Sequence, residues 1–193
     1  MMLSAVLLAG GESRRMGTDK ATILFQGEPL WQRQIRTLRE LRPGKLFVAA
    51  RRQPGWKPVD TNLVLDETPS GGPLSGITAT LARIETSYLV TLAIDMPFIT
   101  TEDLLLLVKK VTANCGAVPM FGGRAEPFAA IYPKEAYAEC AAALSSKDRS
   151  LQRLVRHLAE IGKVEIIHLS QADAKRYHSL NTPEDLNLYP ACR

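Results

Sequence analysis

The stretch between Leu8 and Lys20 contains the residue types that could bind a phosphorylated ligand. Glycines allow the backbone to approach a polyphosphate with its N–H groups turned toward it, and cationic side chains neutralise the remaining charge. A surface turn with scattered charge has a similar composition, but the order of the residues favours a triphosphate cradle. The predicted cradle consists of Leu8, Ala9, Gly10, Gly11 and Gly17, with Arg15 and Lys20 as the catalytic cations that stabilise phosphate charge.

This loop differs from the two common phosphate-binding loops. A Walker A loop has four residues between its glycines, followed by Lys and then Ser or Thr. Here five residues separate Gly11 from Gly17, and Thr18 comes next. The Gly-x-Gly-x-x-Gly fingerprint of dinucleotide-binding proteins is absent as well. The loop therefore predicts a nucleotide site of another class.

Asp95 stands at the end of a second apolar run, Tyr88–Ile94. In open α/β sheets, ligands bind in the crevice at the carboxyl ends of the strands. Mg²⁺ prefers one or two carboxylates together with phosphate oxygens and water. An aspartate that precedes Met96 and Pro97 could also simply cap a turn. Together with the glycine loop, it predicts that Asp95 holds Mg²⁺ beside the bound triphosphate.

Asp66 likewise follows a short apolar run, Leu63–Leu65, and precedes the glycine-containing segment Gly71–Gly76. A backbone without side chains can lie flat against a planar base or a sugar, and the helix expected after this segment offers its N-terminus. An ordinary strand-to-helix turn has the same features. The residues alone favour such a turn, and only the family resemblance described below implies that Asp66, Gly72 and Gly76 bind the nucleoside.

Short apolar runs alternate with helical patterns along the whole chain, which is typical of an α/β fold with a mostly parallel sheet and helices on both faces. The predicted strands are Leu3–Leu8, Leu46–Ala50, Leu63–Leu65, Tyr88–Ala93, Gly116–Val118, Phe128–Tyr132 and Val164–His168. Apolar residues at helical spacing predict helices over Leu30–Leu41, Thr101–Val111 and Leu151–Ile161. Thr100 with Asp103 three residues later predicts a capped start for the second of these helices.

The bulk composition is that of a soluble globular protein of one domain. The chain has 193 residues, of which 46% are hydrophobic and 23% charged. A net charge of +4 suits an anionic ligand but is too small and too dispersed for nucleic acid. No apolar run approaches the ~20 residues of a membrane span. Three widely spaced cysteines without metal-site spacing predict reduced thiols in a cytoplasm.

The order Leu-Ala-Gly-Gly-x-Ser-x-Arg-Met-Gly-x-Asp-Lys, from Leu8 to Lys20, resembles the opening signature of nucleotidyltransferases that act on the molybdenum cofactor. Asp95, the segment Gly72–Gly76 and the segment Asn181-Thr-Pro-Glu-Asp-Leu follow in the order found in the same family. On these residues the chain is identified as a member of the molybdenum cofactor guanylyltransferase family.

The resemblance implies a fold, a reaction and a set of partners. The fold is a single Rossmann-like nucleotidyltransferase domain over residues 1–193, with a nucleotide-binding half at about 1–100 and an acceptor-binding half at about 101–190. The reaction transfers GMP from GTP to molybdopterin or the molybdenum cofactor and releases pyrophosphate, with Mg²⁺ as cofactor. Transient contacts with other cofactor-biosynthesis or molybdoenzyme-maturation proteins are implied, without nucleic acid or membrane partners.

The acceptor is expected to contact the second half of the chain. Arg124 and Glu126 align with the strand that faces the pterin in this family. Arg149 and Arg153 belong to a basic stripe along a predicted helix, and a solvated helix face would explain this stripe equally well. Asn181 could reach the metal site from the C-terminal segment, although the Thr-Pro pair that follows it is also typical of a structural helix cap.

Two alternatives stay open at this stage. Some family members have asparagines where this chain has Val48-Ala49-Ala50-Arg51, so one polar contact to the nucleotide is missing and the choice between GTP and CTP is open. A related transferase that uses CTP or another phosphate acceptor is therefore one alternative, although the Gly10-Gly11 pair favours the guanylyl branch. A non-catalytic nucleotide sensor on the same fold is the other, and the presence of both Lys20 and Asp95 argues against it.

Overall fold

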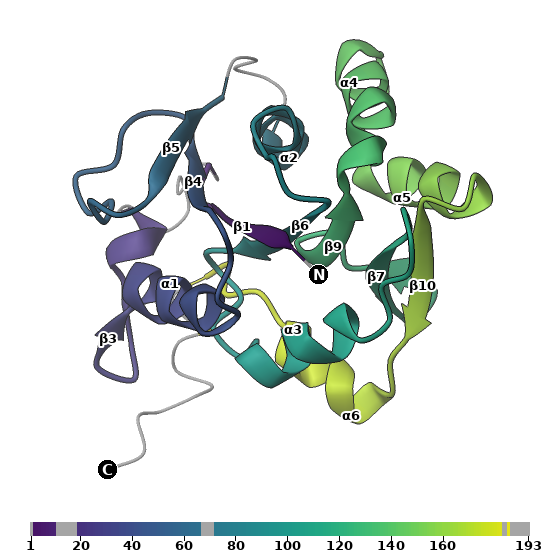
Figure 1. The fold of residues 1–193 in the computed structure, drawn as a ribbon. Helices are drawn as coiled ribbons and strands as arrows, with labels where there is room; N and C mark the ends of the chain where they lie inside the picture. The colour runs from purple at the N-terminus through teal and green to yellow at the C-terminus, as the bar shows by residue number, and fades with distance from the viewer. Residues whose placement is uncertain (1, 11–18, 67–71, 183–184, 186–193) are drawn as a thin grey trace.

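The computed structural model describes residues 2–10, 19–66, 72–182 and 185, and a central β-sheet organises them (Figure 1). The strand order in the sheet is β10-β7-β9-β6-β1-β4-β5, and the short β8 pairs with β7. The strands are β1 (Leu3–Leu8), β4 (Leu46–Ala50), β5 (Asn62–Leu65), β6 (Tyr88–Ala93), β7 (Gly116–Phe121), β8 (Arg124–Ala125), β9 (Ala129–Pro133) and β10 (Val164–His168). A separate antiparallel pair joins β2 (Leu24–Phe25) and β3 (Glu28–Pro29).

Most of the sheet is parallel, as the sequence predicted. β1 pairs in parallel with β4 and β6, β4 with β5, and β7 with β10. β9 runs antiparallel to both of its neighbours, β6 and β7. Each predicted strand is present, although β7 continues beyond the expected Val118 to Phe121.

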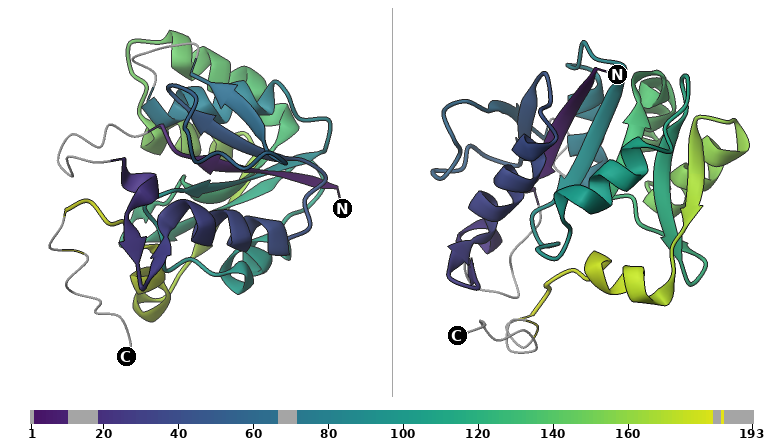
Figure 2. Two further views of the ribbon diagram at one scale, coloured as in Figure 1. Left: turned by 90° about the vertical axis from the view of Figure 1, so that its left-hand side faces the viewer. Right: turned by 60° about the horizontal axis from the view of Figure 1, so that its bottom comes forward.

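Helices cover both faces of this sheet, which confirms the predicted α/β architecture (Figures 1 and 2). On one face lie α1 (Leu30–Glu40) and α3 (Thr101–Val108), and on the other lie α2 (Gly72–Leu81), α4 (Tyr137–Ser145) and α5 (Leu151–Glu160). The short elements are α6 (Gln171–Ala174) and the 3₁₀ turns η1 (Lys20–Thr22), η2 (Lys134–Ala136) and η3 (Lys175–Tyr177).

Strand β1 shows how one short apolar run supports both layers. Successive side chains of a strand point to opposite faces of the sheet. Ala5 and Leu7 accordingly pack in the core beneath α1 and α3, whereas Val6 and Leu8 pack in the core beneath α2. All six residues of β1 are buried, and all but Ser4 are apolar, which is the pattern that a central parallel strand requires.

The start of α3 confirms the predicted capping box. The Thr100 side chain accepts a hydrogen bond from the Asp103 backbone N–H, and the Asp103 carboxylate accepts one from the Thr100 backbone N–H. The helix ends at Val108, three residues before the predicted end at Val111. The Val111 N–H donates to the Val108 carbonyl in a tighter turn, so the last apolar residue belongs to that turn and not to the helix.

Helices α2 and α4 differ from the expectation. The glycine segment was predicted to precede a helix, but the helix already begins at Gly72, and Gly76 lies inside it. A Cβ on Gly76 would lie 3.1 Å from the Ala49 Cβ and 3.4 Å from Leu8 Cδ2, so this glycine lets the helix approach β1 and β4 closely. α4 was not predicted, because its alanine-rich sequence carries little apolar periodicity.

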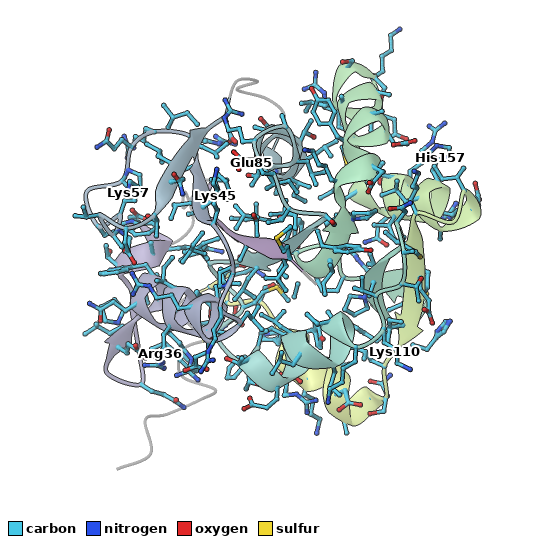
Figure 3. All side chains as sticks on the ribbon, in the orientation of Figure 1. Arg36, Lys45, Lys57, Glu85, Lys110 and His157 are labelled. Carbon is cyan, nitrogen blue, oxygen red and sulfur yellow. The ribbon has the colours of Figure 1, made fainter. Side chains whose placement is uncertain are left out.

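Charged side chains surround the layers described above. Lys110, after α3, and His157, on α5, are exposed and extend outward (Figure 3). Within the described residues, no helix combines the length and the apolar character that crossing a membrane would require.

We expect Gly116→Ala to destabilise the fold by about 3 kcal/mol or more. A Cβ at this position would lie only 2.0 Å from the Ile131 carbonyl oxygen, so β7 and β9 would have to separate. Urea unfolding followed by circular dichroism measures the effect. Gly55→Ala is the control, because nothing lies within 4 Å of its Cβ position, and it should stay within about 0.5 kcal/mol of the wild type. Equal unfolding midpoints for the two variants would contradict the packing described here.

Candidate active site

Four neighbouring parallel strands end at one edge of the sheet, and the predicted site residues follow them. Ala9 follows β1, Arg51 follows β4, Asp66 follows β5, and Ile94 followed by Asp95 comes after β6. Backbone hydrogen bonds between neighbouring strands fix these ends. The Ala9 N–H donates to the Ala49 carbonyl at 2.8 Å, and the Asp66 N–H donates to the Ala50 carbonyl at 3.1 Å. Since β1 has β4 on one side and β6 on the other, this edge is the switch point at which open α/β sheets bind ligands.

A pocket of about 240 Å³ opens at this edge. It brings together many of the residues that the sequence singled out, namely Leu8, Ala9, Gly10, Lys20, Asp66, Gly72, Gly76, Asp95 and Asn181. Residues that the sequence analysis had not selected complete the lining, namely Asp19, Ala49, Pro73, Ala93, Ile94, Phe128 and Ser179. The alanines among them have no functional group that the sequence could single out, so only the fold shows that they line the pocket.

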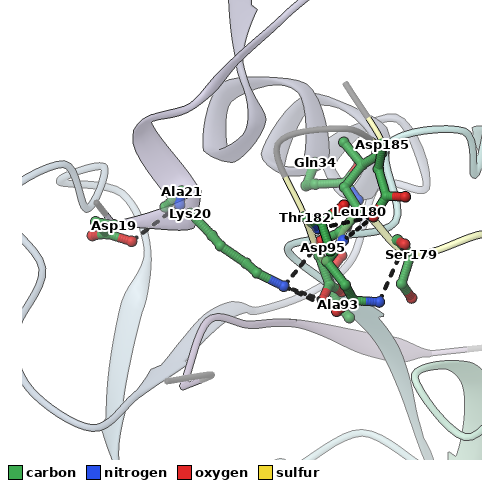
Figure 4. A network of polar contacts seen from close by, with 11 residues as sticks. Asp19, Lys20, Ala21, Gln34, Ala93, Asp95, Ser179, Leu180, Thr182 and Asp185 are labelled. Atoms are coloured by element: carbon green, nitrogen blue, oxygen red, sulfur yellow. Dashed lines mark hydrogen bonds and ion pairs between the residues drawn. The ribbon is translucent and has the colours of Figure 1, made fainter. Parts of the chain in front are cut away.

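Lys20 and Asp95, far apart in the chain, meet inside this pocket (Figure 4). The Lys20 Nζ atom lies 3.1 Å from Asp95 Oδ2, and the two side chains are only 14% and 22% exposed. The same ammonium donates to the Leu180 carbonyl at 2.9 Å and to Asn181 Oδ1 at 3.2 Å. A carboxylate oxygen, a carbonyl oxygen and an amide oxygen therefore converge on one cationic position.

Asp19 and Trp56 hold the base of the lysine in place. Asp19 caps η1 by accepting a hydrogen bond from the Ala21 N–H at 3.0 Å, and its other carboxylate oxygen accepts one from the Trp56 indole at 2.9 Å. Trp56 in turn stacks on Trp31 of α1, with ring centroids 5.7 Å apart. These contacts of Asp19 and Trp56 were not predicted, because a tryptophan within a loop rich in proline and polar residues is their only trace in the sequence.

The C-terminal segment around Asn181 closes the pocket opposite Lys20. The Leu180 N–H donates to the Asp95 carbonyl at 2.7 Å, which fixes this segment against the turn after β6. The carboxylate of Asp185 accepts hydrogen bonds from the backbone N–H groups of Asn181 and Thr182, and these bonds hold its pKa below the ordinary value. The predicted first helical residue, Pro183, lies outside the described residues.

Gln34 of α1 supports the turn that carries Asp95. Its side chain is fully buried, and Nε2 donates to the carbonyls of Ala93 and Met96, each at 2.9 Å. One amide thus binds the chain on both sides of Asp95. The Gln34 Oε1 atom has no partner among the described residues, which indicates that the two donated bonds account for a glutamine at this buried position.

Asp66 and Gly10 form the other end of the pocket. A Cβ on Gly10 would lie 3.1 Å from Asp66 Oδ2, so the carboxylate rests against the bare backbone of this glycine. Burial raises the pKa of Asp66, while the positive charge of Arg51 and a hydrogen bond from Ser75 lower it in part. Asp66 therefore carries its carboxylate in a partly desolvated position beside a cation.

Glu126 lies near Asp95 but outside the residues that line the pocket. Burial raises its pKa to about 7, the Phe128 N–H bonded to Oε1 at 3.1 Å opposes the increase, and the negative charge of Asp95 adds to it. Phe128 lines the pocket, but Glu126 does not. The structure thus places this predicted acceptor residue near Asp95 and out of direct contact with the cavity.

We expect Glu126→Gln to be more stable than the wild type at pH 8 but not at pH 4.5. Below pH 4.5, the ordinary pKa of glutamate, the Glu126 carboxyl is neutral in both the folded and the unfolded chain. Between pH 4.5 and about 7 this carboxyl ionises only in the unfolded chain, so the rising pH favours unfolding of the wild type. The wild type should therefore lose up to about 3 kcal/mol as the pH rises through this window, and the amide variant should not.

Urea unfolding across pH 4.5 to 8 measures this difference. The control is Glu85→Gln. Glu85 is exposed and its bond to Lys45 lowers its pKa, so this substitution should not increase the free energy of unfolding at high pH. Parallel stability curves for Glu126→Gln and the wild type over this range would contradict the assigned pKa.

Several predicted residues do not meet in this pocket. Arg124 is exposed on β8, and Arg153 binds Asp148 at 3.0 Å beside a separate groove between α4 and α5. Within the described chain, neither they nor Arg149 line the pocket that contains Lys20 and Asp95. Arg149 precedes α5, which begins at Leu151, so it does not belong to the predicted helical stripe; for Arg153, helical spacing fixes the face of the helix but not the direction in which that face points. Gly11, Arg15 and Gly17 lie outside the described residues.

Comparison with known proteins identifies the family. The model of the MobA-like NTP transferase domain matches residues 5–162. The chain belongs to this family. A probable molybdenum cofactor guanylyltransferase from Opitutus terrae is 37% identical over 95% of this chain and 92% of its own length. The molybdenum cofactor guanylyltransferase of Pseudomonas putida is 32% identical, and 95% of each chain is covered. These matches confirm the family inferred from the loop Leu8–Lys20 and the prediction of a nucleotidyltransferase enzyme.

Solved structures of MobA-like and other nucleotidyltransferases share the fold. The molybdopterin-guanine dinucleotide biosynthesis protein A of Archaeoglobus fulgidus superposes with a TM-score of 0.77 at 22% identity, covering 96% of both chains. A nucleotidyl transferase of Methanothermobacter thermautotrophicus gives 0.78 at 13% identity, covering 97% of this chain and 96% of its own. At such identities the likeness concerns the fold alone.

Proposed function

We propose that this protein transfers the GMP group of GTP to the terminal phosphate of molybdopterin, or of its molybdenum-loaded form, and releases pyrophosphate. The observation that supports this most is the contact of Lys20 with Asp95 inside a pocket that also contains Gly10 and Asp66. A cation and a carboxylate at one end suit a metal-bound triphosphate, and the other end suits a nucleoside. The relatives named as guanylyltransferases support the choice of GTP and acceptor.

The oxygen atoms around Lys20 fit a divalent cation such as Mg²⁺. Asp95 Oδ2, the Leu180 carbonyl and Asn181 Oδ1 surround one cationic position at 2.9–3.2 Å from Nζ. Among the described residues, no group of three or more acidic, histidine or cysteine side chains converges that could hold a metal alone. This donor set suits Mg²⁺, which keeps water and phosphate oxygens as ligands, with Asp95 as the protein ligand. When bound, the ion would neutralise phosphate charge and orient the α-phosphate.

The reaction requires alignment and charge neutralisation more than a protein nucleophile. An oxygen of the acceptor phosphate attacks the α-phosphorus, a new P–O bond forms, and the bond to the bridging β-oxygen breaks. Pyrophosphate leaves with the electron pair. Lys20 stabilises the growing negative charge on the leaving group, together with Arg15, and Asp66 holds the nucleoside. The backbone between Gly10 and Gly17 binds the β- and γ-phosphates.

We assign the whole chain to one domain in which both halves build the site. In support, β6 of the first half pairs with β9 of the second, and Asn181 contacts Lys20. The acceptor would enter from the side of Asn181 and Phe128, and Arg124, Glu126, Arg149 and Arg153 remain proposed acceptor contacts. Cytoplasmic location also remains a proposal, supported by the free thiols of Cys115 and Cys140.

The experiment that tests this function measures pyrophosphate release from GTP in the presence of Mg²⁺ and purified molybdopterin. We expect release that depends on molybdopterin and is fastest with GTP when GTP, CTP, ATP and UTP are compared. Faster release with CTP would instead indicate a cytidylyltransferase. Binding of GTP without any release would indicate a nucleotide sensor.

A further inference from the structure

Arg51 has no assigned role, although it lies next to Gly10, just outside the residues that line the pocket. It is the first residue after β4, and β4 has alanines where asparagines were expected to contact the nucleotide. Its Cγ and its backbone nitrogen each lie 3.9 Å from the position that a Cβ on Gly10 would occupy. Gly10 lines the pocket, so the stem of the arginine covers the glycine at the pocket rim.

The charged end of Arg51 acts on Asp66. Its guanidinium is close enough to offset part of the increase that burial causes in the pKa of the carboxyl group. Asp66 Oδ2 itself lies 3.1 Å from the same Gly10 Cβ position. A carboxylate, which accepts hydrogen bonds, and the side chain of an arginine, which donates them, thus both lie against Gly10, and Asp66 and Gly10 line the cavity.

Guanine has the complementary arrangement along its edge. Its N1–H and exocyclic amine are adjacent donors, followed by the O6 and N7 acceptors. A carboxylate accepts two hydrogen bonds from the first pair, and an arginine donates two to the second. Cytosine offers only one donor group, and the N6 amine of adenine lies between two acceptors. Guanine is therefore the base that satisfies both side chains at once.

We propose that Arg51 is a specificity-determining residue, which binds the O6 and N7 edge of the guanine while Asp66 binds N1–H and the exocyclic amine. This proposal rests on the proposed function, since it assumes that GTP is the substrate. Arg51 then replaces the polar contact that the alanines of β4 cannot make. A phosphate role is less suited to Arg51, because it lies beside Asp66 and Gly10, whereas the triphosphate is assigned in our proposal to Lys20 and Asp95.

The test compares GTP, 7-deaza-GTP and ITP as ligands by isothermal titration calorimetry, with wild type, Arg51→Met and the control Arg52→Met. Arg52 is the next residue in the chain, and unlike Arg51 it is neither among the nearest neighbours of the Gly10 Cβ position nor among the groups that shift the pKa of Asp66. In the wild type and in Arg52→Met, loss of N7 in 7-deaza-GTP should weaken binding about tenfold. In Arg51→Met, GTP should bind about tenfold to a hundredfold more weakly, and the difference between GTP and 7-deaza-GTP should disappear. ITP, which lacks the exocyclic amine, should be disfavoured by all three proteins, since Asp66 is unchanged.

Two outcomes would overturn the proposal. Unchanged discrimination against 7-deaza-GTP in Arg51→Met would show that the arginine does not contact the base. An equal loss of affinity for GTP, 7-deaza-GTP and CTP would indicate a phosphate contact instead. If wild type bound GTP no better than the other nucleotides and released no pyrophosphate, the proposed function itself would fail, which is a different result from either outcome.

Discussion

Asp95→Asn is expected to lower the rate of nucleotidyl transfer about a thousandfold at saturating GTP. The variant keeps the shape of the side chain but loses the negative charge that would hold the divalent ion. Removal of one such electrostatic contact lowers kcat by about two to three orders of magnitude in comparable sites. It should also require a much higher Mg²⁺ concentration for half-maximal activity. Pyrophosphate release as a function of Mg²⁺ measures both effects.

The matched control for this variant is Asp60→Asn. Asp60 is an exposed carboxylate that binds Arg39 at 2.6 Å, and its side chain is 65% exposed, so its neutralisation should leave the rate unchanged. Circular dichroism should give the same fold for both variants. If Asp95→Asn kept near-normal activity with an unchanged Mg²⁺ dependence, Asp95 would not be the metal ligand.

Lys20→Met is expected to reduce kcat/KM for GTP about a hundredfold to a thousandfold. The ammonium is the cation at the centre of the oxygen atoms of Asp95, Leu180 and Asn181, and in our account it also stabilises the charge on the leaving pyrophosphate. Methionine keeps most of the apolar stem of the side chain and removes the ammonium group, with its charge and its hydrogen-bond donors. Initial rates over a range of GTP concentrations separate the effect on kcat from the effect on KM.

Two comparisons distinguish this role from that of Asp95. Lys45→Met removes an exposed cation that binds only Glu85 among the contacts identified for its side chain, and it should behave as the wild type. Binding of Mn²⁺ without nucleotide should persist in Lys20→Met, because the lysine no longer competes for the carboxylate, and should be lost in Asp95→Asn. Loss of Mn²⁺ binding in Lys20→Met, or an unaltered kcat/KM for GTP, would contradict the separate roles.

The sequence predicted the sheet well because buried parallel strands are short and almost continuously apolar. β1 and β6 are of this kind, and the capping box at Thr100 marked the start of α3 from local chemistry alone. The end of α3 and the start of α2 were misplaced, because tertiary packing and tight turns decide these boundaries. The alanine-rich α4 gave no periodic signal, since it buries a narrow face.

The candidate site was predictable to the extent that its chemistry lies at strand ends. Asp66 and Asp95 each follow an apolar run, and parallel strands bring such positions to one edge. Arg153 of the basic stripe lies at the groove between α4 and α5 and not in the pocket with Asp95. Helical spacing alone does not tell which surface such a stripe faces. Gln34, Trp56 and Arg51 were not predicted, because their roles depend on neighbours far away in the chain.

The most direct test of the central claim is a crystal structure of the protein with GTP and Mn²⁺, with the metal located by its anomalous signal. We expect one Mn²⁺ bound by Asp95 and the triphosphate, the phosphates beside Lys20, and the guanine at Asp66, within the pocket that these residues line. A triphosphate bound in the groove between α4 and α5, or a metal away from Asp95, would contradict this claim.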